Sequence, residues 1–491
     1  MIAALLLIPS VAAVGAFLVR WPRSARVILL AAAAAHAAVT ARAWWVVPPS
    51  AVLTGWVGLD ATGLLFLSLT SALFLACAVY GVGYLRRERD QTADSREGFL
   101  FGHARQATFI GCLLLFLATM TLVCVSAHLG LLWVALEATT LASAPLIYFH
   151  RHHRSLEATW KYLLVCSVGI ALAMLGNFFV AVAASRGPAV QGAHGSHLTL
   201  SWLLSPARQL DPVWLKAGFI LLLVGYGTKM GLAPMHAWLP DAHSEAPSMV
   251  SALLSGALLN CALLAILRAH RVMGAAGLGA FSGQLLTILG LVSLAVAAVL
   301  MIGQTDFKRM LAYSSVEHMG ILALGVGVGG AATAGAMFHA VNHSLAKAML
   351  FLLAGNVLAA CRTKDATQIQ GLLRRLPLSG PLWLAGFLAI AGLSPFGPFI
   401  SELMILRGAL AAGQTAAAVG FLLALGVIFV PMARLVLAMT YGQPAAPAVR
   451  EPWWSVAPPL ALAAGVLMLG LWLPPGLARL LAAAAQAAGG Q

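Results

Sequence analysis

Charged residues are scarce in this chain. Only 9% of its 491 residues are Asp, Glu, Lys or Arg, whereas 61% are apolar, and the mean hydropathy is +0.92. A soluble globular domain carries about 25% charged residues. The composition therefore excludes a soluble globular protein and predicts an all-α polytopic membrane protein.

The sequence also lacks the motifs that hold redox cofactors, nucleotides and structural metals. None of its six cysteines forms a C-x-x-C pair, which argues against an iron–sulfur cluster, a zinc site and a disulfide framework. We find neither a Gly-rich dinucleotide loop nor a Walker-type phosphate loop. We therefore expect no cofactor and no metal in this chain. The cysteines lie inside apolar segments, at Cys77, Cys112, Cys124, Cys166, Cys261 and Cys361.

The formal net charge is +14, which would suit nucleic acid binding. Lys and Arg, however, lie mostly in short segments between apolar runs, where they orient membrane helices. We therefore expect the lipid bilayer, and no nucleic acid, as a partner. The first apolar segment, 1–19, has no charged leader and no cleavage site, so we expect a spanning helix there rather than a removed signal.

Long apolar runs dominate what remains. A spanning helix needs about 20 apolar residues, and this rule predicts about fourteen transmembrane helices. The twelfth contains Pro395 and Pro398 and is expected to form two half-helices. A short Ala-rich tail is expected from Gly476 onward. The predicted spans are 1–19, 26–47, 61–85, 107–126, 129–149, 158–183, 213–233, 247–269, 281–303, 309–328, 331–360, 379–411, 415–441 and 454–475.

The basic residues divide unequally between the two membrane sides. The positive-inside rule places the richer side in the cytoplasm and both termini outside, in a multi-pass protein of the inner (cytoplasmic) membrane. The richer side holds Arg20, Arg23, Arg26, Arg86, Arg87, Arg89, Arg96, Arg105, Arg151, Arg154, Lys308, Arg309, Arg362, Lys364, Arg374, Arg375, Arg434 and Arg450. The other side holds Arg42, Arg186, Arg208, Lys216, Arg268, Arg271 and Arg479.

A short motif occurs twice. GLAP at Gly231–Pro234 and GLSP at Gly392–Pro395 each interrupt an apolar span beside a buried charge. Paired interruptions of this kind indicate the working site of a transporter. We expect two repeats of five helices, 107–269 and 281–441, which the odd helix number makes inverted. Residues 1–106 then add three helices and a cytoplasmic loop, and residues 442–491 add the last helix and tail.

Ionisable residues inside the predicted spans are costly unless they pair or face a wet cavity, and they are therefore functional candidates. Glu137 lies in the middle of the fifth span and Lys229 near the end of the seventh. We predict that they pair, and that opening and closing the pair loads and releases a proton. The alternative is a static ion pair that only fixes helix packing.

The prolines are expected to break two spans into half-helices, and a charged residue lies near the end of a half-helix at each break. Pro234 cannot donate a backbone hydrogen bond, so the half-helix before it is expected to end near Lys229, where the negative dipole end favours a cation. Pro398 suits the first turn of a new half-helix. Glu402 follows in its early turns, where the positive dipole end favours an anion.

A polar stripe lies in the eleventh span. His339, His343 and Lys347 are spaced i, i+4, i+8 and share one helix face. Two such histidines are compatible with a metal site or with hydrogen-bonded core groups. A proton relay with the lysine fits best, because neutral imidazole accepts at one nitrogen and donates at the other. Glu317 and His318 in the tenth span are expected to extend this relay.

Two further segments leave alternatives open. Lys161 follows Glu157 at i+4, which is compatible with a helix-surface pair or with an influence on Glu137. The run HRHHR at His150–Arg154 is compatible with a metal cluster, although a basic cytoplasmic loop is simpler.

Five segments, in this order, resemble the antiporter-like subunits shared by respiratory complex I, membrane-bound hydrogenases and Mrp-type cation/proton antiporters. The resemblance covers about 107–441 and implies fourteen helices, two inverted five-helix repeats, and broken seventh and twelfth helices. It also implies the pair of Glu137 with Lys229 and an exit-side charge at Glu402. The segments are LLWVALEATTL, TKMGLAPMHAWLPDAHSEAPSMVSALLSGALLN, QTDFKRMLAYSSVEHMG, FHAVNHSLAKAMLFLLAGN and GLSPFGPFISELMIL.

One position departs from the family pattern. Many complex I members have a lysine in the eighth span where this chain has Asn260. Asn cannot hold a proton, so we expect bound water, with the eleventh-span lysine and histidines, to replace it. The expected proton-transfer residues are then Glu137, Lys229, His236, His243, Glu317, His318, His339, His343, Lys347 and Glu402, supported by Lys161, Pro234, Asn260, Pro395 and Pro398.

HSEAP, SGALLN and SSVEHMG are most similar to the F components of hydrogenase-4 complexes, whose partner enzyme is a nickel–iron hydrogenase. The resemblance implies a proton-translocating, non-redox subunit of a hydrogenase or complex I-like oxidoreductase. Its expected partners are other antiporter-like and small membrane subunits and soluble hydrogenase-type or quinone-reductase-type redox subunits. The alternatives are an Mrp-type Na+/H+ antiporter subunit and a scaffold whose polar residues only hold helices together.

Overall fold

The structure is a computed structural model of the whole chain. It describes all residues except 20, 48–54, 89–105, 187–197, 206–208, 445 and 490–491, and the side chains of 87–88. Five arginines counted in the charge bias lie outside the described residues: Arg20, Arg89, Arg96, Arg105 and Arg208.

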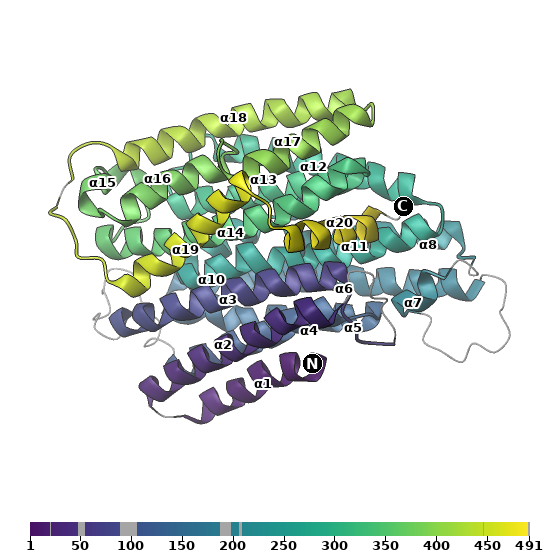
Figure 1. Cartoon of the computed structure of the whole chain (residues 1–491), viewed down its shortest axis with the longest axis horizontal. Coiled ribbons are helices and arrows are strands. Elements are labelled where there is room, and N and C mark those ends of the chain that lie inside the picture. Colours follow the sequence, from purple (N-terminus) through teal and green to yellow (C-terminus); the bar gives the residue numbers. More distant parts are fainter. Residues whose placement is uncertain are drawn as a thin grey trace.

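Long helices running along one common direction make up the described chain (Figure 1). No strand occurs among the described residues, and isolated bridges join Val57 to Ser126, His128 to Thr199 and Asp306 to Asp365. The elements that coincide with the predicted spans are α1 (Ile2–Leu18), α2 (Pro22–Val46), α3 (Ala61–Glu88), α4 (Gln106–Val125), α5 (Leu129–Ile147), α6 (His153–Arg186), α8 (Pro212–Met230) with α9 (Leu239–Glu245), α10 (Ser248–Leu253) with α11 (Leu259–Ala275), α12 (Gly279–Met301), α13 (Phe307–Val328), α14 (Ala331–Cys361), α16 (Ser379–Ile390) with α17 (Gly397–Ala411), α18 (Thr415–Thr440) and α19 (Trp453–Leu471).

The fourteen predicted spans correspond to these elements. Within the described chain, twelve segments are long and apolar enough to cross a membrane. The short helix α1 and the α16–α17 pair supply the other two. The start of α1 and the end of α20 (Pro475–Gly489) lie toward the same end of the bundle (Figure 1). The all-α polytopic prediction is confirmed.

Both predicted helix breaks are confirmed. α8 ends at Met230, and Gly231 takes the left-handed backbone conformation (φ 82°) that glycine adopts without steric cost. The chain then turns into the short helix α9. α16 ends at Ile390, and α17 begins at Gly397 with Pro398 in its first turn.

The centre of the bundle is formed by α10 and α11, in which every residue from Ser248 to His270 is buried. Five residues of this segment, Leu254–Leu258, form a π-helical stretch between α10 and α11, a departure that the sequence did not predict. Such stretches occur frequently at functional sites. Near the other end of α11, Arg268 donates to the carbonyls of Val123 and Cys124 at the end of α4.

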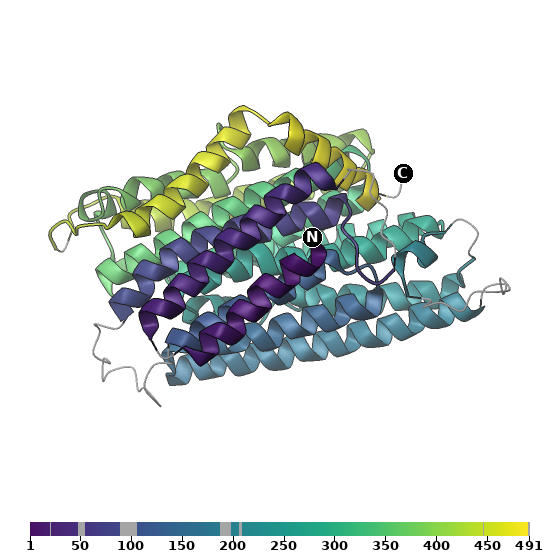
Figure 2. The same ribbon diagram turned by 60° about the horizontal axis from the view of Figure 1, so that its bottom comes forward.

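Two local features were not expected from the sequence: a helix in the C-terminal tail and a histidine that caps α5. The expected Ala-rich tail includes the helix α20, which packs against α3, α11 and α14 and appears in yellow in Figure 2. His128 caps α5, because its Nδ1 accepts hydrogen bonds from the backbone of Gly130 and Leu131. Burial lowers the pKa of His128, which favours the neutral ring that this cap requires.

Candidate functional site

Lys229 lies in the last turn of α8, immediately before the first helix break, and is completely buried. Its ammonium donates to the hydroxyl of Thr140 on α5 and to the hydroxyl of Tyr162 on α6, the latter at 3.1 Å. It also lies 5.0 Å from the centre of the Tyr162 ring. The predicted end of the half-helix at Lys229 is confirmed, and the negative helix dipole there favours its charge.

Glu137 and Lys229 are joined through a third residue. Thr140 Oγ1 accepts from Lys229 and donates to Glu137 Oε2 at 3.2 Å. Ser167 on α6 donates to the other carboxylate oxygen at 3.0 Å. The structure thus brings the two predicted partners into one hydrogen-bonded group, but it inserts a hydroxyl between the acid and the base.

A second buried group lies on α13 and α14. Lys347 donates to the carbonyl of Leu311 at 2.8 Å and to the hydroxyl of Ser314. Glu317 follows Ser314 by one turn on the same face of α13, and both Glu317 and Lys347 are buried. The cation of this group therefore contacts a serine hydroxyl, and the acid lies one helical turn from that serine.

The histidines of α13 and α14 form a chain toward the second helix break. His318 Nδ1 and His339 Nε2 are 2.9 Å apart, and the His343 ring centre lies 5.0 Å from that of His318. His339 Nδ1 lies 2.9 Å from Ser401 Oγ on α17. Ser401 directly precedes Glu402, whose carboxylate packs against Gly392 of the break. The predicted stripe and the predicted acid therefore meet across three helices.

Three residues of this chain would be able to reach one metal ion. His318, His339 and Glu402 each place a ligand atom within 4.8 Å of the others, and all three are buried. The metal alternative considered above paired His339 with His343, whereas the structure groups His339 with His318. The two facing ring nitrogens are already within hydrogen-bond distance of each other, so the arrangement is that of a hydrogen-bonded chain.

Asn260 lies at the start of α11, beside the π-helical stretch. Its amide donates to the Gly256 carbonyl at 2.9 Å and to Ser344 Oγ at 2.6 Å. Nearby, the hydroxyls of Ser255 and Ser315 are 2.8 Å apart. Neutral polar groups therefore occupy the central helix where many complex I members have a lysine. Asn260 contacts α14 at Ser344, the residue that follows His343.

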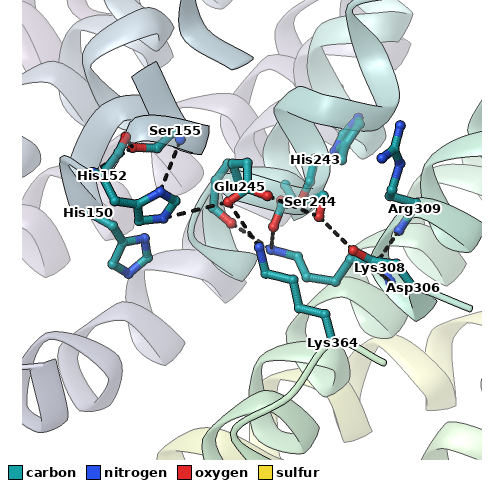
Figure 3. A network of polar contacts seen from close by, with 12 residues as sticks. His150, His152, Ser155, His243, Ser244, Glu245, Asp306, Lys308, Arg309 and Lys364 are labelled. Atoms are coloured by element: carbon teal, nitrogen blue, oxygen red, sulfur yellow. Dashed lines mark hydrogen bonds and ion pairs between the residues drawn. The ribbon is translucent and has the colours of Figure 1, made fainter. Parts of the chain in front are cut away.

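The polar turn after α8 reaches a separate ionic network at the arginine-rich end (Figure 3). Glu245 Oε2 accepts from Lys364 at 3.0 Å and lies 3.6 Å from His152 Nε2. Lys308, at the start of α13, donates to the carbonyls of Ser244 at 3.1 Å and Ala246 at 2.6 Å. This network ties segments of both proposed repeats together.

The remaining predicted residues lie around this network. His243 is buried and stacks on Phe351 at 5.0 Å between ring centres, whereas half-buried His236 lies edge-on to Tyr313 at 6.4 Å. Lys161 is half-exposed and pairs with Glu157 at 2.6 Å and with Asp241 at 2.9 Å. The pair with Glu157 is the first of the two alternatives considered for this lysine.

Sequence reasoning missed several members of these groups. Thr140 lies one turn beyond Glu137, and Ser401 directly precedes Glu402, so a search for hydroxyls near each buried charge would have found both. Tyr162 and the contact of His152 with Glu245 carried no local signal, because each joins helices that are far apart in the sequence.

The fold and these groups define a class of protein: a polytopic helical membrane protein with ionisable side chains buried beside two broken helices. Residues 126–428 match the protein family described as "NADH:quinone oxidoreductase/Mrp antiporter, TM". This match covers more than half of the 491 residues, and the chain belongs to this family.

Individual relatives agree with this membership. The chain is 37% identical over 390 residues to "Hydrogenase-4 component F homolog" of Methylacidiphilum infernorum, a match that covers 78% of this chain and 79% of that relative. It is 28% identical to "Hydrogenase-4 component B" of Escherichia coli, over 72% of this chain and 51% of that relative. The chain thus spans about half the length of the second relative.

Solved structures share the fold. A chain of the Mrp complex from Dietzia sp. DQ12-45-1b matches with a TM-score of 0.84 at 21% identity, over 99% of this chain and 97% of that one. A chain of respiratory complex I from Thermus thermophilus with bound NADH matches with a TM-score of 0.82 at 22% identity, over all of both chains.

Proposed function

We propose that this chain is a proton-translocating subunit, without a redox centre of its own, of a hydrogenase-4-like or complex I-like oxidoreductase in the inner membrane. Redox energy arrives from soluble hydrogenase-type or quinone-reductase-type partners. The proton path runs along Glu137, Lys229, His236, His243, Glu317, His318, His339, His343, Lys347 and Glu402.

One observation carries this proposal. Ionisable side chains inside the bundle contact hydroxyls and imidazoles, which accept at one point and donate at another. They form three separate groups: Lys229 with Thr140 and Glu137, Lys347 with Ser314, and His318 with His339 and Ser401. A scaffold needs only satisfied hydrogen bonds, and apolar packing provides comparable stability at less cost. A group that gains or loses a proton can keep a hydrogen bond to a hydroxyl or an imidazole in either protonation state.

The position of Glu137 supports a membrane partner. This acid is only partly buried, and its neighbours Val134 and Leu141 are 49% and 63% exposed. A carboxylate on a lipid-facing surface within the bilayer is costly. We therefore infer that another membrane subunit of the assembly covers this face of α5.

The charge bias supports an orientation. The network of Glu245, Lys308 and Lys364 lies at the arginine-rich end, which the positive-inside rule assigns to the cytoplasm. The two chain termini would then lie on the outer side. Glu402, near the second helix break, would deliver the proton toward that side.

The experiment purifies the chain with its native assembly, identifies copurifying subunits by mass spectrometry, and reconstitutes the assembly into vesicles. We expect soluble redox subunits to copurify and a reductant–oxidant pair to drive proton movement without sodium. A second candidate, an Mrp-type antiporter subunit, is favoured by the fold match to the Mrp complex. Proton movement driven only by a sodium gradient, with no redox subunit bound, would establish that candidate and exclude the first.

A further inference from the structure

Two hydrogen-bonded branches leave the Lys229 ammonium. One leads through Thr140 Oγ1 to Glu137 Oε2. The other leads to the hydroxyl of Tyr162, which lies 2.7 Å from Ser143 Oγ. The two branches differ in where they end, and this decides which of them is able to carry a proton.

The tyrosine branch ends at a backbone carbonyl. Ser143 Oγ donates to the carbonyl of Thr139 at 2.7 Å, so the single proton of this hydroxyl is already committed. Tyr162 must then donate to Ser143. A peptide carbonyl does not retain a proton, and this branch therefore holds the lysine in place without passing its proton on.

The threonine branch ends at an acid. The Thr140 hydroxyl has one proton and two lone pairs, so it accepts from the lysine while it donates to the carboxylate. Thr140 and Lys229 are buried, and the three groups come from α5 and from the last turn of α8, where the first helix break begins.

We infer that Thr140 is the relay through which a proton passes between Lys229 and Glu137. This inference rests on the proposed function. In the transfer, a Lys229 Nζ–H bond breaks as Thr140 Oγ1 takes that proton, and the original Thr140 O–H proton moves to Glu137 Oε2. The lysine becomes neutral, the glutamate becomes a neutral acid, and the threonine hydroxyl is regenerated. Total charge is unchanged and no electron is transferred.

This relay has an energetic consequence. Separated charges are expensive in a low-dielectric interior, and the transfer converts a cation and an anion into two neutral groups. The direction of transfer then follows whichever state the surroundings favour. Rotation of one hydroxyl about its C–O bond opens or closes the connection, without any movement of the helices.

The chain provides matched variants for a test. Thr140→Val keeps the shape and removes the hydroxyl, whereas Thr140→Ser keeps the hydroxyl. Thr139→Val alters the neighbouring buried threonine, which donates only to the Leu136 carbonyl at 2.6 Å. Each variant is purified in the complete assembly, and redox-driven proton uptake into vesicles is measured with a pH-sensitive dye.

We expect Thr140→Val to slow proton uptake about 100-fold, at the lower end of what a positioned proton-transfer group contributes. Thr140→Ser should stay within about twofold of the wild type, because it restores the donor and the acceptor. Thr139→Val should behave as the wild type. Should Thr140→Val fail to assemble, Thr140→Ala removes the same hydroxyl and relieves any clash.

Two results would overturn the relay. In one, Thr140→Val pumps normally while Glu137→Gln is inactive, which leaves the proposed function standing without Thr140. In the other, Thr140→Ser is as slow as Thr140→Val, which assigns the effect to packing. Normal pumping by both Thr140→Val and Glu137→Gln would instead contradict the proposed function itself.

Discussion

The two buried lysines of the proposed proton path each lie beside a side-chain hydroxyl. Lys229 donates to Thr140 and Tyr162, and Lys347 donates to Ser314. A hydroxyl donates or accepts by rotation, so it satisfies a lysine or a carboxyl group in either protonation state. Beside an apolar side chain, one of the two protonation states would lack a hydrogen-bond partner, at a cost of about 1–3 kcal/mol. At the scale of the residue, hydroxyls therefore lower the free-energy cost of adding or removing a proton at these buried groups.

Ser401 tests this argument. Its hydroxyl is the partner of His339 Nδ1 at 2.9 Å and also donates to the Pro398 carbonyl at 2.9 Å. We expect Ser401→Ala to leave one imidazole nitrogen unpaired, to lower the free energy of unfolding by about 1–3 kcal/mol, and to slow proton uptake severalfold. Chemical unfolding in detergent and the vesicle assay measure the two effects.

The control for this prediction is Thr440→Val. Thr440 is likewise buried, but its hydroxyl donates only to the carbonyl one turn before it, Val436, at 2.6 Å. We expect Thr440→Val to lower the free energy of unfolding slightly and to leave proton uptake unchanged. Equal proton uptake by Ser401→Ala and Thr440→Val would contradict a role for the His339–Ser401 contact.

The sequence predicted the charges of this site better than their connections. Burial costs identified Glu137, Lys229, Lys347 and Glu402, because a charge in an apolar run is visible without a structure. Thr140 was not predicted, because an uncharged threonine costs little free energy to bury inside a helix and is common there. Which hydroxyl faces which charge depends on how α5, α6 and α8 rotate against one another, and apolar helices with little amphipathic pattern do not encode that rotation.

At the scale of the element, the two broken helices position the site. The prolines Pro234, Pro395 and Pro398 predicted both breaks, because proline removes a backbone donor. The left-handed turns at Gly231 and Gly392 are seen only in the structure. The π-helical stretch before Asn260 was not predictable in this way. No proline or charge marks it, and it depends on packing against α3 and α14.

Lys308 fixes the corner that follows the first break. Its ammonium donates to the carbonyls of Ser244 and Ala246, between α9 and α10, and the side chain is buried. We expect Lys308→Met to leave both carbonyls unpaired and to lower the free energy of unfolding by about 2–4 kcal/mol, as measured by chemical unfolding in detergent.

The neighbouring residue provides the comparison. Arg309 is 40% exposed and pairs with Asp241 at 3.0 Å on the surface. Arg309→Met should therefore change stability by less than about 1 kcal/mol. If Lys308→Met also changed stability by less than about 1 kcal/mol, the corner drawn in Figure 3 would not depend on Lys308.

At the scale of the whole molecule, two polar groups lie beside two breaks in one bundle. Lys229 and Glu137 serve the first break, and the histidine chain with Glu402 serves the second. Asn260 contacts Ser344 between them, on the buried central helix. The all-α class and the broken helices followed from composition and proline positions, whereas the packing of α20 did not, because an Ala-rich segment carries little positional information.

The central claim is that Lys229 takes part in proton movement and is not only a structural cation. The most direct measurement is redox-driven proton uptake by vesicles that contain the assembled complex with Lys229→Ala. Blue-native electrophoresis confirms assembly, and Lys216→Ala, on the same helix α8 but near its start, serves as the control. We predict that Lys229→Ala assembles and loses proton uptake, while Lys216→Ala retains it. Normal proton uptake by the assembled Lys229→Ala complex would contradict the account.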